Sequence, residues 1–441
     1  MDNAKYVEWF RNSAPYINAH RGETFVIQFD GAAVLDPSFA NLIHDLALLE
    51  SLGVRLVVVH GARPQIESAL QTAGHIASYH NGVRITSTPA MDAVKMATGS
   101  VRLEIEALLS MGLRNSPMDG AGIRVTSGNF VTAKPMGVRD GIDFGHTGEV
   151  RRIDAHSIRQ HLSLDEVVLI SPLGYSPTGE IFNLQAQDVA TEIAIELHAA
   201  KLLLMSEDGP LRNDTGTQIF ELTLEQAKEL ETERRHEDRD TAQTQDQLLG
   251  HAVRACRHGV RRCQIIDRHL DGSLIAELFT RDGSGTMISA DLYDDTRQAT
   301  IDDVGGILEL IGPLEDDGTL VRREREKLEQ EINRFRVMER DGTVIACAAL
   351  YPLNDDGDYE LACVAVHEAY RRDGRGESLL EDAHRQARSI GAQRLIVLTT
   401  RTIHWFREHG YEPLTVEELP AKRQALYNYQ RNSKVLVKTI S

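Results

Sequence analysis

The stretch ELACVAVHEAYRRDGRGESLLEDAHRQARSI, residues 360–390, decides the architecture of the C-terminal part of the chain. Leu361–Val366 is apolar without alternation, which predicts a strand buried on both faces. A basic loop with two glycines follows, and apolar residues then recur at helical spacing from Leu379 to Ile390. The pattern therefore predicts a buried strand, an anion-binding loop and an amphipathic helix that begins near Glu377.

The loop before this helix is suited to binding a pyrophosphate. Gly374 and Gly376 let the backbone approach an anion closely, and the first N–H groups of a helix are unpaired and favour negative charge. Arg371, Arg372 and Arg375 add positive charge. An ordinary basic surface turn is the alternative for so short a motif, but its place between a buried strand and an amphipathic helix favours the pyrophosphate site.

Residues 297–441 resemble the GNAT acetyltransferase superfamily. The loop has that superfamily's Q/R-x-x-G-x-G/A form, and WFREHGY at 405–411 is similar to its later aromatic motif. The resemblance implies an α+β domain that uses acetyl-CoA as co-substrate and holds the pantetheine arm between two splayed strands, the one quoted above and Leu395–Thr399. A backbone N–H at Cys363 or Val364, on the unpaired edge, is then expected to stabilise the oxyanion.

The same resemblance implies acetyl-CoA contacts along the strand, the loop and the start of the helix. These contacts are Cys363, Val364, Val366, Arg371, Arg372, Gly374, Arg375, Gly376 and Glu377. Cys363 has an alternative role as the nucleophile for an acetyl-enzyme, but a buried strand cysteine is more often a small apolar residue. Direct transfer in a ternary complex needs no such nucleophile.

Length and composition limit the remaining possibilities. A chain of 441 residues suggests two domains, and its net charge of −18 disfavours nucleic acid and anionic membranes as partners. The four cysteines form no C-x-x-C pair and no histidines cluster at ligand spacing, so we expect no metal site and a reducing compartment. The polar N-terminus and the lack of a run of about 20 apolar residues predict a cytoplasmic protein.

The N-terminal part has a different pattern. Short apolar runs, beginning with Phe25–Phe29 and Arg55–Val59, alternate with helical segments as far as Ile288. The alternation predicts an α/β domain with a parallel sheet that is covered on both faces. We place the parts of the chain at 1–20 (an amphipathic N-terminal helix), 21–288 (the α/β domain), 289–296 (a linker) and 297–441 (the α+β domain).

The α/β domain resembles the amino acid kinase family, of the acetylglutamate kinase type. VVVHGARPQI (57–66), SGNFV (127–131), residues 182–211 and ELFTRDGSGT (277–286) carry the resemblance, which implies a parallel-sheet sandwich. Active kinases hold the nucleotide phosphates with a K-x-G-G loop, but this chain has Gln28-Phe29-Asp30-Gly31. Because the lysine is missing and an aspartate repels phosphate, we expect the fold without kinase activity.

An inactive amino acid kinase-like domain joined to a GNAT domain resembles the bacterial N-acetylglutamate synthase family over essentially the whole chain. The resemblance implies acetyl transfer to the α-amine of L-glutamate, the first step of arginine biosynthesis, in a hexamer regulated by L-arginine. The effector site would include Glu277 and Gly285, with residues 1–20 supplying a helix. An active acetylglutamate kinase, a non-catalytic arginine sensor and a GNAT enzyme for another amine are the alternatives.

The implied reaction needs a base for the acceptor ammonium and a proton for the CoA thiolate. Glu360, at the start of the first splayed strand, is the candidate base and would act through a water. Phe406 stands where many GNAT enzymes have a tyrosine acid, so the resemblance moves the acid to Thr399, with Thr400 or water as alternatives. Each of these residues could instead be an ordinary strand residue.

The two carboxylates of glutamate call for arginine forks, which bind carboxylates in bidentate fashion. The resemblance implies Arg323 for one carboxylate, and Arg322 and Arg325 are close competitors in the same stretch, which is predicted to be helical. Arg431 with Ser433 would bind the other carboxylate. The alternative for any one of these arginines is a surface salt bridge.

Overall fold

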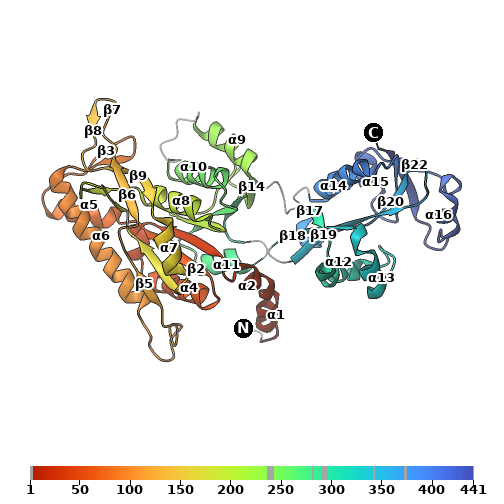
Figure 1. The fold of residues 1–441 in the computed structure, drawn as a ribbon, viewed down its shortest axis with the longest axis horizontal. Helices are drawn as coiled ribbons and strands as arrows, with labels where there is room; N and C mark the ends of the chain where they lie inside the picture. Colours follow the sequence, from red (N-terminus) through yellow and green to blue (C-terminus); the bar gives the residue numbers. More distant parts are fainter. Residues whose placement is uncertain are drawn as a thin grey trace. The chain divides into compact units, whose positions relative to one another are not determined.

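The computed structural model describes residues 3–235, 243–280, 283–289, 296–340, 343–371 and 375–440 of the chain. The chain folds into two compact units, Met1–Leu292 and Tyr293–Ser441, which run from red to green and from teal to blue in Figure 1. Residues 290–295, most of the predicted linker, lie outside the described residues.

The first unit is built on a sheet of eight strands in the order β14-β16-β15-β13-β1-β2-β10-β5. In that order the strands are Glu221–Thr223, Thr286–Ser289, Arg262–Asp267, Lys201–Ser206, Thr24–Phe29, Arg55–His60, Glu166–Ile170 and Arg124–Thr126. Every neighbouring pair is parallel except β15 and β16. The predicted parallel sheet is thereby confirmed.

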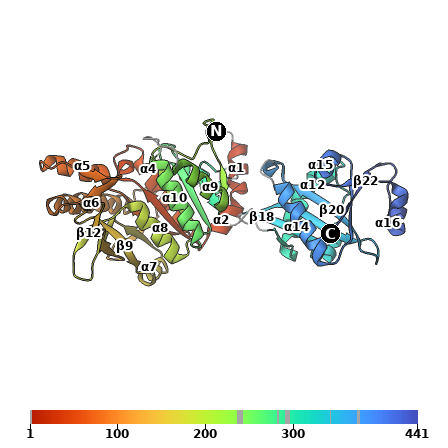
Figure 2. The same ribbon diagram turned by 90° about the horizontal axis from the view of Figure 1, so that it is seen from above.

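Helices cover both faces of this sheet, as its apolar strands require. Along β1, Phe25, Ile27 and Phe29 point into one core and Val26 into the other. The first core lies under α4 (Phe39–Ser51), α5 (Arg63–Thr72), α6 (Thr88–Leu109) and α11 (Ser273–Phe279). The second lies under α7 (Ala155–Leu162), α8 (Ala186–Leu197) and α10 (Gln243–Arg257). Helices α8 and α10 lie side by side in Figures 1 and 2.

Smaller elements complete the first unit. A second sheet has the order β12-β11-β6-β9, formed by Ile181–Asn183, Leu173–Tyr175, Val131–Pro135 and Gly148–Ile153. The remaining elements are α3 (Gly31–Val34), α9 (Leu224–Arg235), β3 (Ser78–His80), β4 (Val83–Ile85), β7 (Val138–Arg139) and β8 (Ile142–Asp143).

The predicted single N-terminal helix is two helices, α1 (Asn3–Asn12) and α2 (Ala14–His20). Pro15 has no N–H to donate to the preceding turn, so it fits only in the first turn of a new helix. The Ser13 hydroxyl donates to the Trp9 carbonyl at 3.0 Å and ends α1. The break allows α2 to take a direction of its own.

The second unit is a seven-stranded sheet in the order β17-β18-β19-β20-β21-β23-β22. In that order the strands are Thr296–Gln298, Phe335–Arg340, Thr343–Pro352, Asp358–Val366, Arg394–Thr399, Lys434–Thr439 and Glu412–Leu414. Its helices are α12 (Val304–Asp316), α13 (Arg325–Glu331), α14 (Arg375–Ser389), α15 (Ile403–Glu408) and α16 (Ala421–Ala425). Only β20 and β21 pair in parallel among the described neighbours, which confirms the predicted α+β domain.

The two parallel strands separate soon after they meet. β20 pairs with β21 only at Asp358–Glu360, opposite Arg394–Ile396. On its other side β20 has a bulge against β19, where Cys363 has a φ of +52°. The bulge reverses the alternation of side chains, so that Leu361 and Cys363 enter cores on opposite faces of the sheet.

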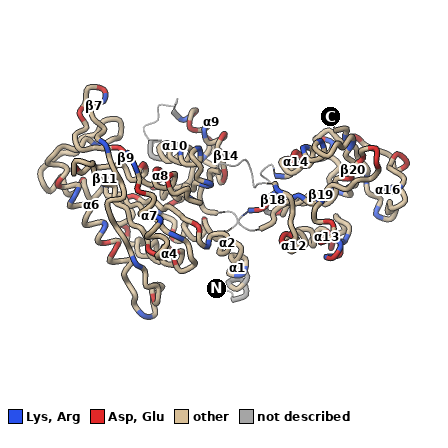
Figure 3. Tube along the Cα trace, in the orientation of Figure 1, with Lys and Arg blue, Asp and Glu red and all other residues tan. Residues whose placement is uncertain are grey.

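Acidic and basic residues are interspersed along both units in Figure 3, in keeping with a net charge of −18. Among the described residues, every helix is too short or too polar to cross a bilayer. The same residues hold no cluster of three or more histidine, cysteine or acidic side chains arranged to bind a metal ion.

Candidate active site

Glu360, the predicted base, lies at the point where β20 and β21 separate. Its carboxylate is held by Arg423 of α16, with Nε 2.6 Å from Oε2 and Nη2 3.0 Å from Oε1. The two side chains are only 15% and 20% exposed, so the pair is well shielded from water. No motif singled out Arg423, because the two residues are far apart in the chain and the pair forms only in the folded sheet.

Arg323 lies beside the separated part of β20. Its Nε–H donates to Cys363 Sγ at 3.1 Å, and its guanidinium carbon is 5.5 Å from the centre of the Tyr351 ring. The predicted helix was wrong at this position, because α13 begins at Arg325 and the Arg323 N–H donates to Glu315 of α12 at 2.9 Å. The extended backbone is what lets the Arg323 side chain reach the strand.

The competing arginines are placed differently. Arg322 is exposed, and Arg325 pairs with Glu329 at 2.8 Å on the surface of α13. Among these three arginines, Arg323 is therefore the one directed at the separated strands.

Cys363 is buried in the core under α12. Burial raises the pKa of its thiol to about 11, so the thiolate is scarce at neutral pH. Its positive φ places the backbone of Cys363 and Val364 outside the regular ladder with β19. This geometry suits a backbone donor better than a sulfur nucleophile.

Thr399 ends β21 with its hydroxyl in a turn. Its Oγ1 accepts the N–H of Arg401 at 3.3 Å and of Thr402 at 3.1 Å, and it lies 2.8 Å from Thr402 Oγ1. Because these N–H groups occupy its two acceptor positions, the Thr399 hydroxyl donates its proton to Thr402 Oγ1, and it must turn away from Thr402 to protonate a thiolate. Thr400 is partly buried beside it.

Arg431 and Ser433 lie in the segment before β23. Arg431 Nη2 donates to the Thr319 carbonyl, whereas its buried Nε has no hydrogen-bond partner among the described residues. Ser433 is 7% exposed, and its carbonyl accepts the Tyr427 hydroxyl at 2.6 Å. Arg431 is thus brought to the loop between α12 and α13 that also carries Arg323.

The predicted coenzyme loop is described in part, because Arg372 and Gly374 lie outside the described residues. Arg371 Nε donates to the Val366 carbonyl at 3.1 Å. The helix α14 begins at Arg375, earlier than predicted, and the Arg375 side chain is 1% exposed with its guanidinium 5.0 Å from the centre of the Tyr370 ring.

The first turn of α14 rests on Trp405 of α15. A side-chain carbon at Gly376 would lie 3.3 Å from the Trp405 ring, and the Trp405 indole donates to Glu377 Oε1 at 3.3 Å. A glycine at 376 therefore allows the helix N-terminus to lie against the aromatic motif.

The one tyrosine of the aromatic motif is buried in the core of the second unit. Tyr411 is 2% exposed, and its hydroxyl bonds His384 Nε2 at 3.0 Å. Burial lowers the pKa of His384 to about 4, so the imidazole is neutral. Phe406 lies edge-on to Tyr411 in the same core. Tyr411 is therefore a core residue in this structure.

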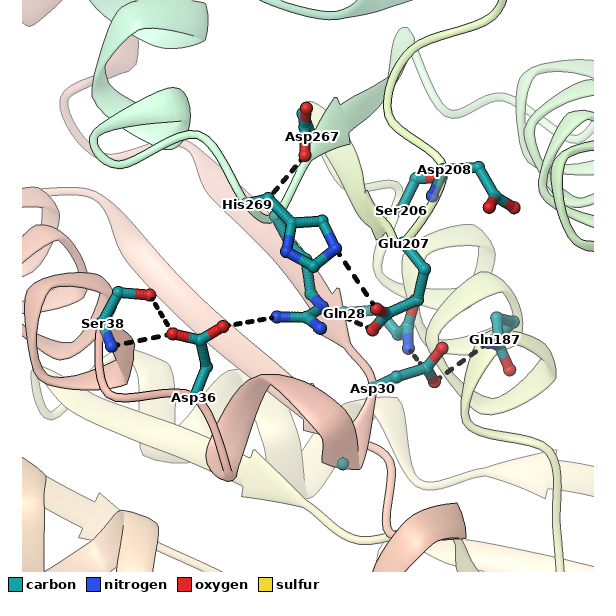
Figure 4. Close-up of polar contacts among 12 residues, drawn as sticks. Gln28, Asp30, Asp36, Ser38, Gln187, Ser206, Glu207, Asp208, Asp267 and His269 are labelled. Carbon is teal, nitrogen blue, oxygen red and sulfur yellow. Dashed lines mark hydrogen bonds and ion pairs between the residues drawn. The ribbon is translucent and has the colours of Figure 1, made fainter.

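In the first unit, the position of the kinase phosphate loop is occupied by the protein itself (Figure 4). Asp30 Oδ1 accepts the side-chain amides of Gln28 at 3.3 Å and Gln187 at 3.2 Å. Burial, followed by the charge of Glu207, raises the pKa of Asp30. A carboxyl group held in this way is the opposite of the donor-rich cradle that phosphates require.

The two former glycine loops are also in direct contact. Gln65 Nε2 donates to the Gly31 carbonyl at 2.6 Å, and a side-chain carbon at Gly31 would lie 2.8 Å from the α-carbon of Ala62. The space between the loops is therefore filled by protein atoms, and the absence of kinase activity stays a prediction.

The residues predicted to bind the effector are Glu277 and Gly285. They lie in α11 and just before β16 of the eight-stranded sheet. Glu277 of α11 accepts the N–H groups of Ser284 at 2.7 Å and Gly285 at 2.8 Å. His20 of α2 contacts the same helix, with Nε2 2.8 Å from the Leu278 carbonyl, and α2 lies beside α11 in Figure 1. The N-terminal helices and the predicted effector residues are thus neighbours.

Comparisons with known proteins identify the family of each unit. Models of the amino acid kinase family and of the GNAT acetyltransferase family match residues 23–267 and 306–411. An amino-acid acetyltransferase of Azotobacter vinelandii is 54% identical over 435 residues, 99% of each chain, and that of Ectopseudomonas mendocina is 52% identical with the same coverage.

Two solved structures align with 99% of this chain and 99% of their own length, each at 36% sequence identity. The N-acetylglutamate synthase of Neisseria gonorrhoeae with coenzyme A and L-arginine has a TM-score of 0.85, and the same enzyme with coenzyme A and N-acetyl-glutamate has a TM-score of 0.63. The chain therefore belongs to the amino-acid acetyltransferases and joins an amino acid kinase family unit to a GNAT acetyltransferase unit.

Proposed function

We propose that the chain transfers the acetyl group of acetyl-CoA to the α-amine of L-glutamate, giving N-acetyl-L-glutamate and CoA in the first step of arginine biosynthesis. The acetyltransferase relatives and the synthase structures with coenzyme A support this activity. In this chain the proposal rests on the separation of β20 from β21. Arg323 lies beside the separated part of β20, and Arg431 contacts the loop that carries Arg323.

The reaction begins with loss of a proton from the acceptor ammonium. Glu360 can take that proton through a water, and Arg423 holds its carboxylate in one orientation. The free amine then attacks the thioester carbonyl carbon. A C–N bond forms, and the carbonyl oxygen receives an electron pair and becomes negative.

The oxyanion is stabilised by a backbone N–H of the bulge at Cys363 and Val364. The nitrogen carries an extra proton after the attack and releases it to water. Collapse of the intermediate then breaks the C–S bond, and CoA leaves as a thiolate. The thiol pKa is about 8.5, so protonation needs little help. The hydroxyl of Thr399 is our candidate donor.

The two carboxylates of glutamate are assigned to Arg323 and Arg431. The Nε–H of Arg431, which has no hydrogen-bond partner within the described part of the chain, offers a carboxylate a donor beside the Nη groups, and Ser433 lies two residues away. An acceptor without the second carboxylate would leave one of these partly buried guanidinium groups without a carboxylate partner, which is costly.

We propose that L-arginine regulates the enzyme at Glu277 and Gly285 with α1 and α2. The Neisseria gonorrhoeae structure with L-arginine and the contact of His20 with α11 support this assignment. A carboxylate such as that of Glu277 suits a guanidinium. A cytoplasmic homo-oligomer, a hexamer by resemblance, is part of the same proposal.

The experiment is a CoA thiol-release assay across amino acids, with and without arginine. We expect glutamate to be strongly preferred over glutamine and aspartate, and equal rates for all three would reject the proposal. Arg431→Gln should raise the KM for glutamate about tenfold or more without changing the KM for acetyl-CoA. Arg325→Gln, on the surface of α13, is the matched control.

The rival function is an acetylglutamate kinase. Asp30 and the contact between Gly31 and Ala62 disfavour it, because both exclude a phosphate from the loops. ATP turnover with N-acetylglutamate should therefore be undetectable.

A further inference from the structure

A cavity of about 220 Å³ lies in the first unit, between α6 and the carboxyl ends of β5 and β10. Lys95, Thr98 and Arg102 line it from α6, and Ser127 and Ser171 line it just after the two strands. Ligands of open α/β sheets bind outside the carboxyl ends of the strands. The lining residues belong neither to the candidate active site nor to the candidate effector site.

Two polar atoms in the wall of this cavity are buried without a hydrogen-bond partner among the described residues. They are Thr98 Oγ1 and Arg102 Nε. Thr98 is only 1% exposed, and Glu106 Oε1 approaches Arg102 Nε at 3.4 Å as an ion pair without hydrogen-bonding geometry. Because a buried polar group without a partner is costly, both atoms point to a ligand that accepts hydrogen bonds.

Both serine hydroxyls that line the cavity already donate hydrogen bonds to protein atoms. Ser127 donates to Glu106 Oε1 at 2.9 Å. Nδ1 of His60 lies 3.0 Å from the Gly61 carbonyl and must carry the ring proton, so His60 Nε2 accepts the Ser171 hydroxyl at 2.9 Å. The donors left for a ligand are therefore on α6.

The charge of the lining agrees with these donors. Its charged residues are Lys95 and Arg102, both cations, and Lys95 is also paired at 2.6 Å with Asp92, one turn earlier on the same face of α6. Thr98 O–H, Arg102 Nε–H and the Lys95 ammonium thus come from positions 95, 98 and 102, which share one face of the helix. A hydroxyl and two cations on one face are suited to an oxyanion.

We propose that this cavity binds a small metabolite through an oxyanion, a carboxylate or a phosphate group, held by Thr98 and Arg102 and neutralised by Lys95. The volume fits a small molecule and excludes a nucleoside triphosphate. The site would give the amino acid kinase-like unit a second ligand besides the one proposed near Glu277, and it does not depend on the acetyltransferase assignment.

The test uses the full chain saturated with CoA, so that the basic loop before α14 is occupied. Inorganic phosphate and acetate are titrated separately by calorimetry at constant ionic strength, which distinguishes the two sources of the oxyanion. We expect saturable binding of at least one, weakened about tenfold or more by Thr98→Val and by Arg102→Met. Arg114→Met removes an exposed arginine and should change nothing.

If Arg102→Met fails to fold, two further measurements can still test the proposal. Without ligand, Thr98→Val should not lower the unfolding temperature, because the hydroxyl it removes has no partner among the described residues. Crystals soaked in selenate should show anomalous selenium signal beside Thr98. Absence of saturable binding, wild-type affinity in Thr98→Val, or selenate found only elsewhere would each overturn the proposal.

Discussion

Glu360, the candidate base, is oriented by its ion pair with Arg423. Arg423 lies in α16, outside the motifs recognised in the sequence. Arg423→Met should lower kcat/KM for glutamate about tenfold to a hundredfold, because a carboxylate that turns away from the acceptor loses the geometry of proton transfer. Steady-state kinetics with both substrates measures this loss. The KM for acetyl-CoA should not change.

Arg423→Lys serves as the matched control for charge. Lysine keeps the positive charge but cannot form the bidentate contact, so its activity should lie between those of the wild type and Arg423→Met. Full activity in Arg423→Met would show that Glu360 needs no such orientation.

Cys363 has a role in the backbone rather than in covalent chemistry. Cys363→Ala should retain kcat within about threefold, since the thiol pKa of about 11 disfavours an acetyl-enzyme. Alanine also keeps the backbone of the bulge without adding a β-branch. Turnover and mass spectrometry after mixing with acetyl-CoA provide the measurement, and a loss of kcat by about a thousandfold would restore the nucleophile hypothesis.

At the scale of elements, the strand and the helix of 360–390 were predictable because their apolar patterns depend only on local sequence. The non-helical backbone at Arg323, after α12, was not predictable. The arginines and glutamates of this stretch have high helix propensity whether or not the backbone is helical. Arg323 is extended because its N–H bonds Glu315 of another helix, a contact that no local pattern contains.

Tertiary pairing also explains what was missed in the candidate active site. Glu360 could be selected from its position at the end of a strand, whereas Arg423 became visible only when α16 was placed against β20. The kinase-like loops differ in this respect, since Gln28 and Asp30 were enough to predict from the sequence that the phosphate site is lost, and that loss stays a prediction.

His384 of α14 makes the stability of the second unit depend on pH. Its pKa falls from 6.5 in the unfolded chain to about 4 in the fold, so between these values the unfolded state binds the extra proton. Stability is therefore full above pH 6.5 and declines as the pH falls towards 4, by up to about 1.4 kcal/mol per pH unit.

Urea unfolding followed by Trp405 fluorescence in a Trp9→Phe background measures this dependence. His384→Gln can still bond the Tyr411 hydroxyl but does not titrate, so its unfolding free energy should change less between pH 6.5 and 4. An unchanged pH dependence in His384→Gln would assign the effect to other groups.

At the scale of the whole molecule, an effector in the first unit must act on chemistry in the second. Such coupling is reciprocal: if arginine changes the affinity for acetyl-CoA by some factor, acetyl-CoA changes the affinity for arginine by the same factor. Calorimetry of each ligand with and without the other should therefore return one coupling free energy, of about 1–3 kcal/mol in typical cases.

The contact between α2 and α11 offers a specific test of that coupling. His20 is 3% exposed, bonds the Leu278 carbonyl at 2.8 Å, and packs edge-on against Phe25 and Phe279. His20→Ala should detach α2 from the helix that carries Glu277, so the response to arginine should weaken about tenfold or more while activity without arginine is retained. His75→Ala, at an exposed position, is the control. Because the residues predicted to bind acetyl-CoA lie in the second unit, the acetyl-CoA affinity of His20→Ala without arginine should be unchanged. An arginine response equal to that of the wild type would mean that α2 takes no part in the effector site.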